Sequence, residues 1–101
     1  MDSESIVVRV DEDLIELIPQ YLGNRRKDIE AVSRALGDED YESISTLGHT
    51  MKGSGGGFGF DLIGDIGSGL EEAAKGHDAA RIRQWLDKLQ DFLNRVHVIP
   101  E

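Results

Sequence analysis

The sequence predicts an all-α fold: an antiparallel up-down four-helix bundle, preceded by an N-terminal arm and a short extra helix. Between about residues 19 and 96, apolar residues recur every three or four positions in four segments, which is the spacing of one helix face. The connections between these segments are short, which favours antiparallel neighbours. We therefore expect one domain over residues 1–101, with the arm at 1–10 and the helical bundle at about 12–96.

The composition fits one small domain and excludes several classes of protein. The 101 residues are 39% hydrophobic, enough for a single core. The chain has no cysteine, which excludes disulfides and thiolate metal sites and fits a reducing cytoplasm. Its net charge of −9 argues against nucleic acid or an anionic membrane as a partner. No apolar run approaches the roughly 20 residues of a membrane span, and the acidic start is unlike a secretory signal.

The first twenty residues are interpreted as an arm followed by a helix start. Residues 6–10 are strand-like, but no second strand candidate is found to pair with them, so we expect an extended arm lying on the helices. Asp11 is the expected cap of the short helix, with Val10 and Ile15 as a hydrophobic staple. Pro19 either interrupts this helix or begins the next one.

Apolar faces define three of the bundle helices. In the helix that begins near Pro19 the face comprises Leu22, Ile29, Val32 and Leu36, and Gly37 is the expected left-handed cap. The basic residues of this helix lie outside, either as a solvated face or as part of a surface that docks an acidic partner; they are Arg25, Arg26 and Lys27. In the helix at about 61–75 the inward residues are Leu62, Ile66, Leu70 and Ala73. In the last helix they are Ile82, Trp85 or Leu86, Leu89, Leu93 and Val96.

Glycine and aspartate mark the ends of these last two helices. Gly76 is expected to close the helix at 61–75, and Asp78 to cap the one that follows. Three glycines weaken the helix at 61–75 and would allow it to approach the glycine-rich segment before it; they are Gly64, Gly67 and Gly69.

That glycine-rich segment, residues 49–60, is the centre of the sequence. Five of the seven residues from Gly53 to Gly59 are glycine. A P-loop is excluded by spacing, because Lys52 precedes the glycines and no Gly-Lys-Ser/Thr occurs. A dinucleotide-binding loop needs glycines at i, i+2 and i+5, and from each possible start the last position falls on Phe58, Phe60 or Leu62.

A helix explains the same segment better. Its apolar stripe steps by three and four through Ile44, Leu47, Met51, Ser54 and Phe58. Met51 lies about 200° around the helix from His49, so the imidazole is expected to point away from the core. Lys52, Gly53 and Gly56 flank His49 on this outer face. Each interior glycine costs a helix about 1 kcal/mol, so we expect a functional need for a flat surface there.

These motifs resemble a known family. His-x-x-Lys-Gly-Ser at 49–54, followed by Gly59, resembles the phosphoacceptor helix of histidine-containing phosphotransfer (HPt) domains. The run Gly-Gly-Phe-Gly-Phe at 56–60 is similar to the phosphoacceptor domain of chemotaxis-type histidine kinases. The likeness continues through Leu-Glu-Glu-Ala-Ala at 70–74 and Gly-His-Asp at 76–78, and covers about residues 12–96.

The resemblance implies roles for particular residues. His49 is the expected nucleophile, which takes a phosphoryl group as a phosphoramidate, and Lys52 lies near the phosphoryl oxygens. Glu71 is the expected partner of the imidazole, although a shift of one residue would substitute Glu72. Gly53 and Gly56 are expected to let a partner approach, the alternative being that such glycines pack against the next helix. No cofactor or metal is expected on this chain, because in the family the magnesium belongs to the receiver.

The function implied is signal transduction in a bacterial-type two-component phosphorelay. We expect His49 to take its phosphoryl group from a receiver-domain aspartate and pass it to another. The expected partners are response-regulator receiver domains and a histidine kinase or hybrid kinase, with this chain a cytoplasmic monomer. The chain has no ATP-binding motif, so autonomous kinase activity is not expected.

Three alternatives remain at this stage. The chain could be the phosphoacceptor domain of a chemotaxis-type kinase, charged by a separate kinase domain, although the initial methionine and the proline near the end favour a complete small protein. It could be a helical adaptor in which His49 is inert, or a nucleotide-binding domain with residues 53–59 as the phosphate loop. His77 and His97 have no ligand constellation, and Trp85 and Phe92 are expected to pack.

Overall fold

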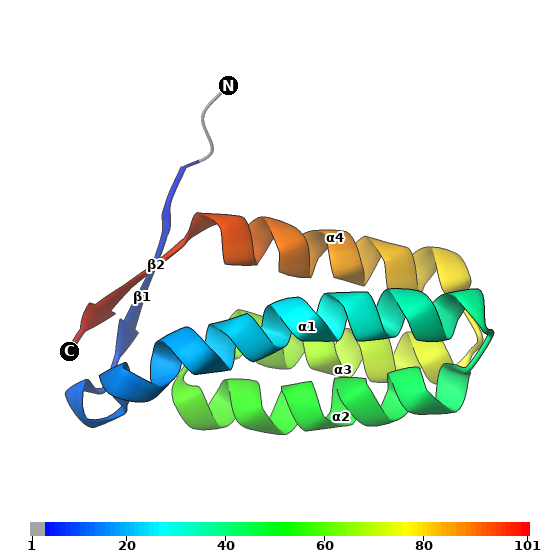
Figure 1. Cartoon of the computed structure of the whole chain (residues 1–101), viewed down its shortest axis with the longest axis horizontal. Coiled ribbons are helices and arrows are strands. Elements are labelled where there is room, and N and C mark those ends of the chain that lie inside the picture. The colour runs from blue at the N-terminus through cyan, green and yellow to red at the C-terminus, as the bar shows by residue number, and fades with distance from the viewer. Residues whose placement is uncertain (1–3) are drawn as a thin grey trace.

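The computed structural model describes residues 4–101, which form four helices packed side by side (Figure 1). The elements in chain order are β1 (Ile6–Val10), the 3₁₀ helix η1 (Glu12–Leu17), α1 (Ile18–Gly37), α2 (Tyr41–Phe58), α3 (Asp61–Lys75), α4 (Ala79–Arg95) and β2 (Val96–Pro100). Short turns join successive bundle helices, so α1 to α4 run up and down (Figure 1). The predicted four-helix bundle with a short helix before it is confirmed.

The core lies between the four helices. Its fully buried side chains are apolar and come from every bundle helix; the largest are Ile44, Met51, Phe60, Ile63, Ile66, Leu70, Ile82, Leu89 and Phe92, with Val32 from α1. In α2 the buried Met51 and Ile44 belong to the predicted stripe. In α3 the predicted face is wrong at its start, because Ile63 is buried whereas Leu62 is 39% exposed. For α4 the sequence offered Trp85 or Leu86 as the inward residue, and the structure buries Leu86.

The helix ends follow ordinary capping chemistry. Asp40 and Asp78 cap α2 and α4, each accepting a hydrogen bond of 3.1 Å from the backbone N–H three residues on. Gly59 ends α2 with φ +85°, where a glycine is favoured. The predicted left-handed cap at Gly37 is wrong: Gly37 is still helical, and Glu39, two residues later, takes the positive φ of 56°.

The start of α1 settles the alternatives for Pro19. Asp11 caps η1 by accepting a hydrogen bond from the Asp13 N–H at 2.9 Å, as predicted. The chain then passes directly into α1 at Ile18, so Pro19 lies in the first helical turn. Proline is tolerated there because the N–H it lacks has no partner within the helix.

A small parallel sheet joins the two ends of the described chain, and it corrects the prediction of an unpaired arm. β1 pairs with β2 in register, Ile6 opposite Val96 and Val10 opposite Pro100. The prediction failed because residues 96–100 were assigned to the end of the last helix and the tail beyond it, so β1 had no visible partner. The backbone of Val96 is already extended. Both strands lie across one end of the bundle (Figure 1).

Candidate functional site

Helix α2 presents His49 to solvent midway along its length. Met51, on the packed side, is 1% exposed, whereas the His49 side chain is 70% exposed. The predicted angular separation of these two residues therefore matches their burial. A ring nitrogen on this face is open to a group arriving from outside.

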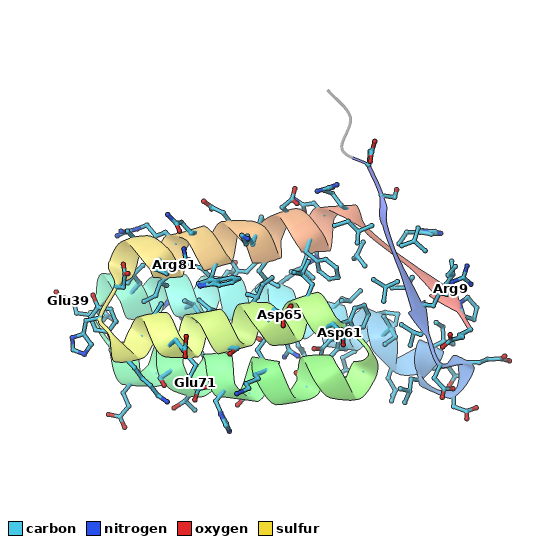
Figure 2. The ribbon with its side chains drawn as sticks, turned by 180° about the vertical axis from the view of Figure 1, so that it is seen from behind. Arg9, Glu39, Asp61, Asp65, Glu71 and Arg81 are labelled. Atoms are coloured by element: carbon cyan, nitrogen blue, oxygen red, sulfur yellow. The ribbon has the colours of Figure 1, made fainter. Side chains whose placement is uncertain are left out.

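Helix α3 brings an acidic side chain to His49. The Glu71 carboxylate oxygen Oε2 lies 3.2 Å from the imidazole Nδ1, and the Glu71 side chain is only 16% exposed. Its neighbour Glu72 is exposed and lines a separate hollow beside Trp85. Figure 2 shows Glu71 on α3 beside α2. Of the two candidate carboxylates, the structure places Glu71 at the histidine.

Small residues allow α2 and α3 to come close enough for this contact. A Cβ added at Gly48 would lie 2.7 Å from the Gly67 carbonyl oxygen and 2.8 Å from the Glu71 backbone nitrogen. A Cβ added at Gly67 would collide with the backbone of Lys52, whereas one at Gly64 would be in ordinary contact with the Lys52 carbonyl oxygen at 3.4 Å. Gly69 packs against the Trp85 ring. The predicted close approach therefore involves Gly64 and Gly67 but not Gly69.

Two lysines lie near the imidazole and its carboxylate. Lys52 is one turn after His49 on α2; it is exposed and borders an open hollow with Asp61 and Asp65 of α3. Figure 2 shows these two aspartates along α3. Lys75, at the end of α3, places its Nζ 3.6 Å from Glu71 Oε2. Sequence analysis missed Lys75, although its position four residues after Glu71 is the spacing of a helical ion pair.

The glycines beyond His49 differ in their surroundings. A Cβ added at Gly53, Gly56 or Gly57 would meet no atom within 4 Å. At Gly55 it would lie 2.5 Å from the Gly64 backbone nitrogen. Gly53 and Gly56 thus leave a bare helix surface beside the histidine, and Gly55 is the glycine that packs.

A polar cluster supports α2 from its inner side. Arg25 donates hydrogen bonds to Asp28 at 2.7 Å and to Ser54 Oγ at 3.3 Å, and its guanidinium stacks on Tyr21. Burial raises the pKa of Asp28, and the adjacent Arg25 partly offsets this. Arg25 was predicted to lie outside with Arg26 and is instead part-buried, because it bridges α1 to Ser54.

The remaining titratable side chains of residues 4–101 do not assemble a second site. His77 stacks on Tyr41, with ring centroids 4.3 Å apart, at the turn between α3 and α4. His97 is exposed on β2. Within residues 4–101 no three His, Cys, Asp or Glu side chains are grouped so that they could hold a metal ion. None of the helices described is both long and apolar enough to cross a membrane.

Comparison with known proteins identifies the family. Comparisons with curated proteins and with solved structures returned no match. The family model of the Hpt domain matches residues 16–98, more than four fifths of the chain and all four bundle helices. Hpt domains carry phosphoryl groups on histidine in phosphorelay signalling and are carriers, not kinases. The chain therefore belongs to the Hpt domain family.

Proposed function

We propose that His49 accepts a phosphoryl group from an aspartyl phosphate on a response-regulator receiver domain and passes it to the aspartate of another receiver. The observation that carries this proposal is the exposed imidazole whose Nδ1 lies 3.2 Å from Glu71. A carboxylate at Nδ1 favours the tautomer that keeps its proton there, which leaves the lone pair of Nε2 free. Hpt domains generally interact with receiver domains and kinases.

The imidazole of His49 is the group of this chain that forms a bond in the transfer. Nε2 attacks the phosphorus of the aspartyl phosphate, a P–N bond forms, and the P–O bond breaks to restore the receiver carboxylate. A carboxylate of a second receiver then attacks the phosphorus of the phosphohistidine, a P–O bond forms, and the P–N bond breaks to restore the imidazole. Lys52, exposed one turn from His49, is placed to offset charge on the phosphoryl oxygens. Magnesium is supplied by the receiver.

The bare surface at Gly53 and Gly56 supports docking of such a partner. Because neither residue has a side chain, the rim of a receiver active site can approach the α2 backbone next to His49. A side chain there would stand between the two proteins. We therefore assign these glycines to partner docking.

The proposal is tested by transfer of label. Incubated with a phosphorylated receiver and magnesium, the protein should gain one phosphoryl group that is labile in acid and stable in base. His49→Gln should abolish the label while circular dichroism shows an unchanged helical fold, because the exposed imidazole contributes little to packing. Label persisting on the variant would identify another acceptor.

The role of Glu71 is tested by comparing it with its neighbour. Glu71→Ala should slow transfer without preventing it, because the nucleophile remains but its orientation is lost. Glu72→Ala is the matched control, since Glu72 is exposed and lines the hollow beside Trp85. A loss in Glu72→Ala with unchanged kinetics in Glu71→Ala would contradict the assignment.

A phosphoacceptor domain charged by a separate chemotaxis-type kinase domain is the second candidate. The Gly-Gly-Phe-Gly-Phe run favours it, and both of its aromatic residues stack on Tyr21, Phe58 at 4.4 Å and Phe60 at 5.6 Å between ring centroids. Labelling by such a kinase domain with ATP, and not by a phosphorylated receiver, would favour this alternative.

A further inference from the structure

Exposed apolar side chains gather at the end of the bundle that the sheet crosses. Among residues 4–101, the large hydrophobic side chains that are exposed are Val7 (56%), Leu17 (53%) and Leu62 (39%). Val7 and Leu62 line one hollow, between β1 and the turn that joins α2 to α3, whereas Leu17 is not among its lining residues. We call it the β1 hollow. Apolar side chains scattered singly on a surface are ordinary, but two that share one hollow indicate an interaction site.

The β1 hollow is continuous with the surface beside His49. A second hollow, between α2 and α3, is lined in part by Gly56, and Asp61 borders both hollows. Figure 2 shows Glu71, Asp65 and Asp61 in this order along α3, with β1 crossing the bundle beyond Asp61. The two hollows therefore form one shallow path from the histidine to β1.

Helix α2 is bare along this path, and only in this direction. After His49, the positions one and two turns on are Gly53 and Gly56, where an added Cβ would meet no atom within 4 Å. Before His49, the corresponding positions on the same face are Thr46 and Glu42, whose side chains are exposed. A partner seated over His49 can thus approach the helix closely on the side of β1, and is held away on the other side.

The usual size of a protein interface is sufficient to include the β1 hollow. Gly59, which lines this hollow, follows His49 by ten residues, a separation of about 15 Å along a helix axis. A standard interface buries roughly 800 Å² on each partner, which is a patch about 30 Å across. A partner whose interface extends from His49 toward β1 therefore covers Val7 and Leu62 as well.

We propose that Val7 and Leu62 form the far end of the receiver-docking surface: the receiver domain that exchanges a phosphoryl group with His49 also buries these two side chains against an apolar patch of its own. This inference rests on the function proposed above. It gives β1 a role in partner binding in addition to its pairing with β2. Arg9 and Asp61 border the hollow, so the apolar contact has a charged rim, as protein interfaces commonly do.

The experiment compares transfer from a receiver with transfer from a small donor, in the whole protein. The variants are Val7→Thr, which keeps the β-branched shape favoured in a strand, Leu62→Gln, which keeps a good helix former, and the two together. Leu17→Gln is the matched control, because Leu17 is nearly as exposed as Val7 but does not line the hollow. The receiver is the one that labels His49. Phosphoramidate is the small donor: Nε2 takes its phosphoryl group as the P–N bond breaks and ammonia leaves, so no partner has to dock.

The variants of the β1 hollow should weaken binding of the receiver without slowing the chemistry. Each single change should raise the KM for the receiver about threefold, the size expected for a contact at the edge of an interface, and the two together about tenfold. The value of kcat should be unchanged, because the contact is lost equally from the ground state and the transition state. Leu17→Gln should match wild type, and all variants should react with phosphoramidate at the wild-type rate.

Three results would overturn the inference while leaving the proposed function intact. The first is an unchanged KM in the double variant. The second is an equal rise in Leu17→Gln, since the effect would then not depend on the hollow. The third is a slower reaction with phosphoramidate, because the changes would then act through the fold around His49.

Two further results concern other occupants and the function itself. Sedimentation velocity tests a second copy of this chain: a dimer that the double variant dissociates, together with an unchanged KM, would assign the hollow to self-association and overturn the inference. If no receiver labels His49, the proposed function fails and the inference fails with it.

Discussion

Two sets of glycines on α2 face opposite environments. On the inner side, a Cβ at Gly48 or Gly55 would collide with backbone atoms of α3. On the outer side, a Cβ at Gly53 or Gly56 would meet open space. The inner residues are glycine because packing demands it. The outer residues gain nothing from packing, and no positive φ requires a glycine at either position.

The difference indicates which glycines serve function. A glycine in a helix interior costs about 1 kcal/mol relative to alanine, a large fraction of a domain stability of order 5–15 kcal/mol. At the inner positions this cost is offset by the close approach of α3, which also carries Glu71 to His49. At the outer positions no contact offsets it, and this supports a docking role for the bare surface.

The largest expected effect is on stability, and it distinguishes two adjacent glycines, Gly55 and Gly56. Gly55→Ala should lower the free energy of unfolding by about 1–3 kcal/mol, because the new Cβ would lie 2.5 Å from the Gly64 backbone nitrogen and α3 would have to move. Gly56→Ala is the matched control and should raise it by up to about 1 kcal/mol. Thermal melting followed by circular dichroism measures both, at roughly 4–8 °C per kcal/mol for a domain of this size.

The signs of the two changes in melting temperature test whether the inner and outer glycines of α2 differ. Equal destabilisation in both variants would mean that the outer glycines are structural as well. A stabilised Gly55→Ala would mean that α2 and α3 separate easily and that their contact is not tight.

The bundle could be predicted because helix periodicity is local. Met51 and His49 are two residues apart, so 3.6 residues per turn places them on opposite sides without knowledge of the rest of the chain. The parallel sheet could not be predicted in this way, since β1 and β2 are about 90 residues apart and β2 follows α4 without a break. Leu62 and Ile63 lie four and three residues before the buried Ile66, so both fit helical spacing and periodicity alone could not decide between them; packing in the bundle buries Ile63.

The site was predicted from a resemblance, and its contacts depend on tertiary packing. His49 and Glu71 are 22 residues apart, and only the close packing of α2 on α3 brings them within 3.2 Å. Lys75 has a local spacing to Glu71 that a pattern could have detected. Arg25 was misplaced because a charged residue among other basic residues is usually solvated, whereas here Asp28, Ser54 and Tyr21 surround it.

A smaller effect on stability, with an opposite effect on function, is expected at Gly53. Gly53→Ala should stabilise the protein by up to about 1 kcal/mol, because the added methyl meets no atom and reduces the backbone entropy of the unfolded chain. Gly53→Gln should also be tolerated by the fold. Both should slow transfer from a phosphorylated receiver, Gln more than Ala, because the side chain stands one turn from His49.

A small donor separates docking from chemistry at Gly53. With phosphoramidate, both variants should react at the wild-type rate, since no partner has to approach the α2 surface. If both variants melt at lower temperature, Gly53 is a structural residue and the docking argument is wrong. If both melt higher but transfer from the receiver is unchanged, the partner docks elsewhere.

The smallest expected effects concern two carboxylates near α2: Asp28 of α1, which lies on the packed side, and Asp40, the exposed N-cap of α2. Burial raises the pKa of Asp28, which contacts Arg25 beside α2. The side-chain and backbone hydrogen bonds from Ser43 lower the pKa of Asp40, the exposed cap of α2. The folded state therefore binds more protons than the unfolded state at Asp28, and fewer at Asp40.

The two carboxylates should thus act on stability with opposite slopes in acid. For Asp28, the free energy of unfolding falls as pH rises from its ordinary value of 3.8 through the raised pKa, because ionisation is disfavoured in the fold. For Asp40, the contribution is present above pH 3.8 and is lost as pH falls through the lowered pKa. As pH rises above 3.8, the stability of Asp28→Asn relative to wild type should therefore increase. As pH falls below 3.8, the stability lost in Asp40→Asn relative to wild type should shrink. Urea unfolding at a series of pH values measures both differences, and slopes of the same sign would show that Asp28 is as well solvated as Asp40.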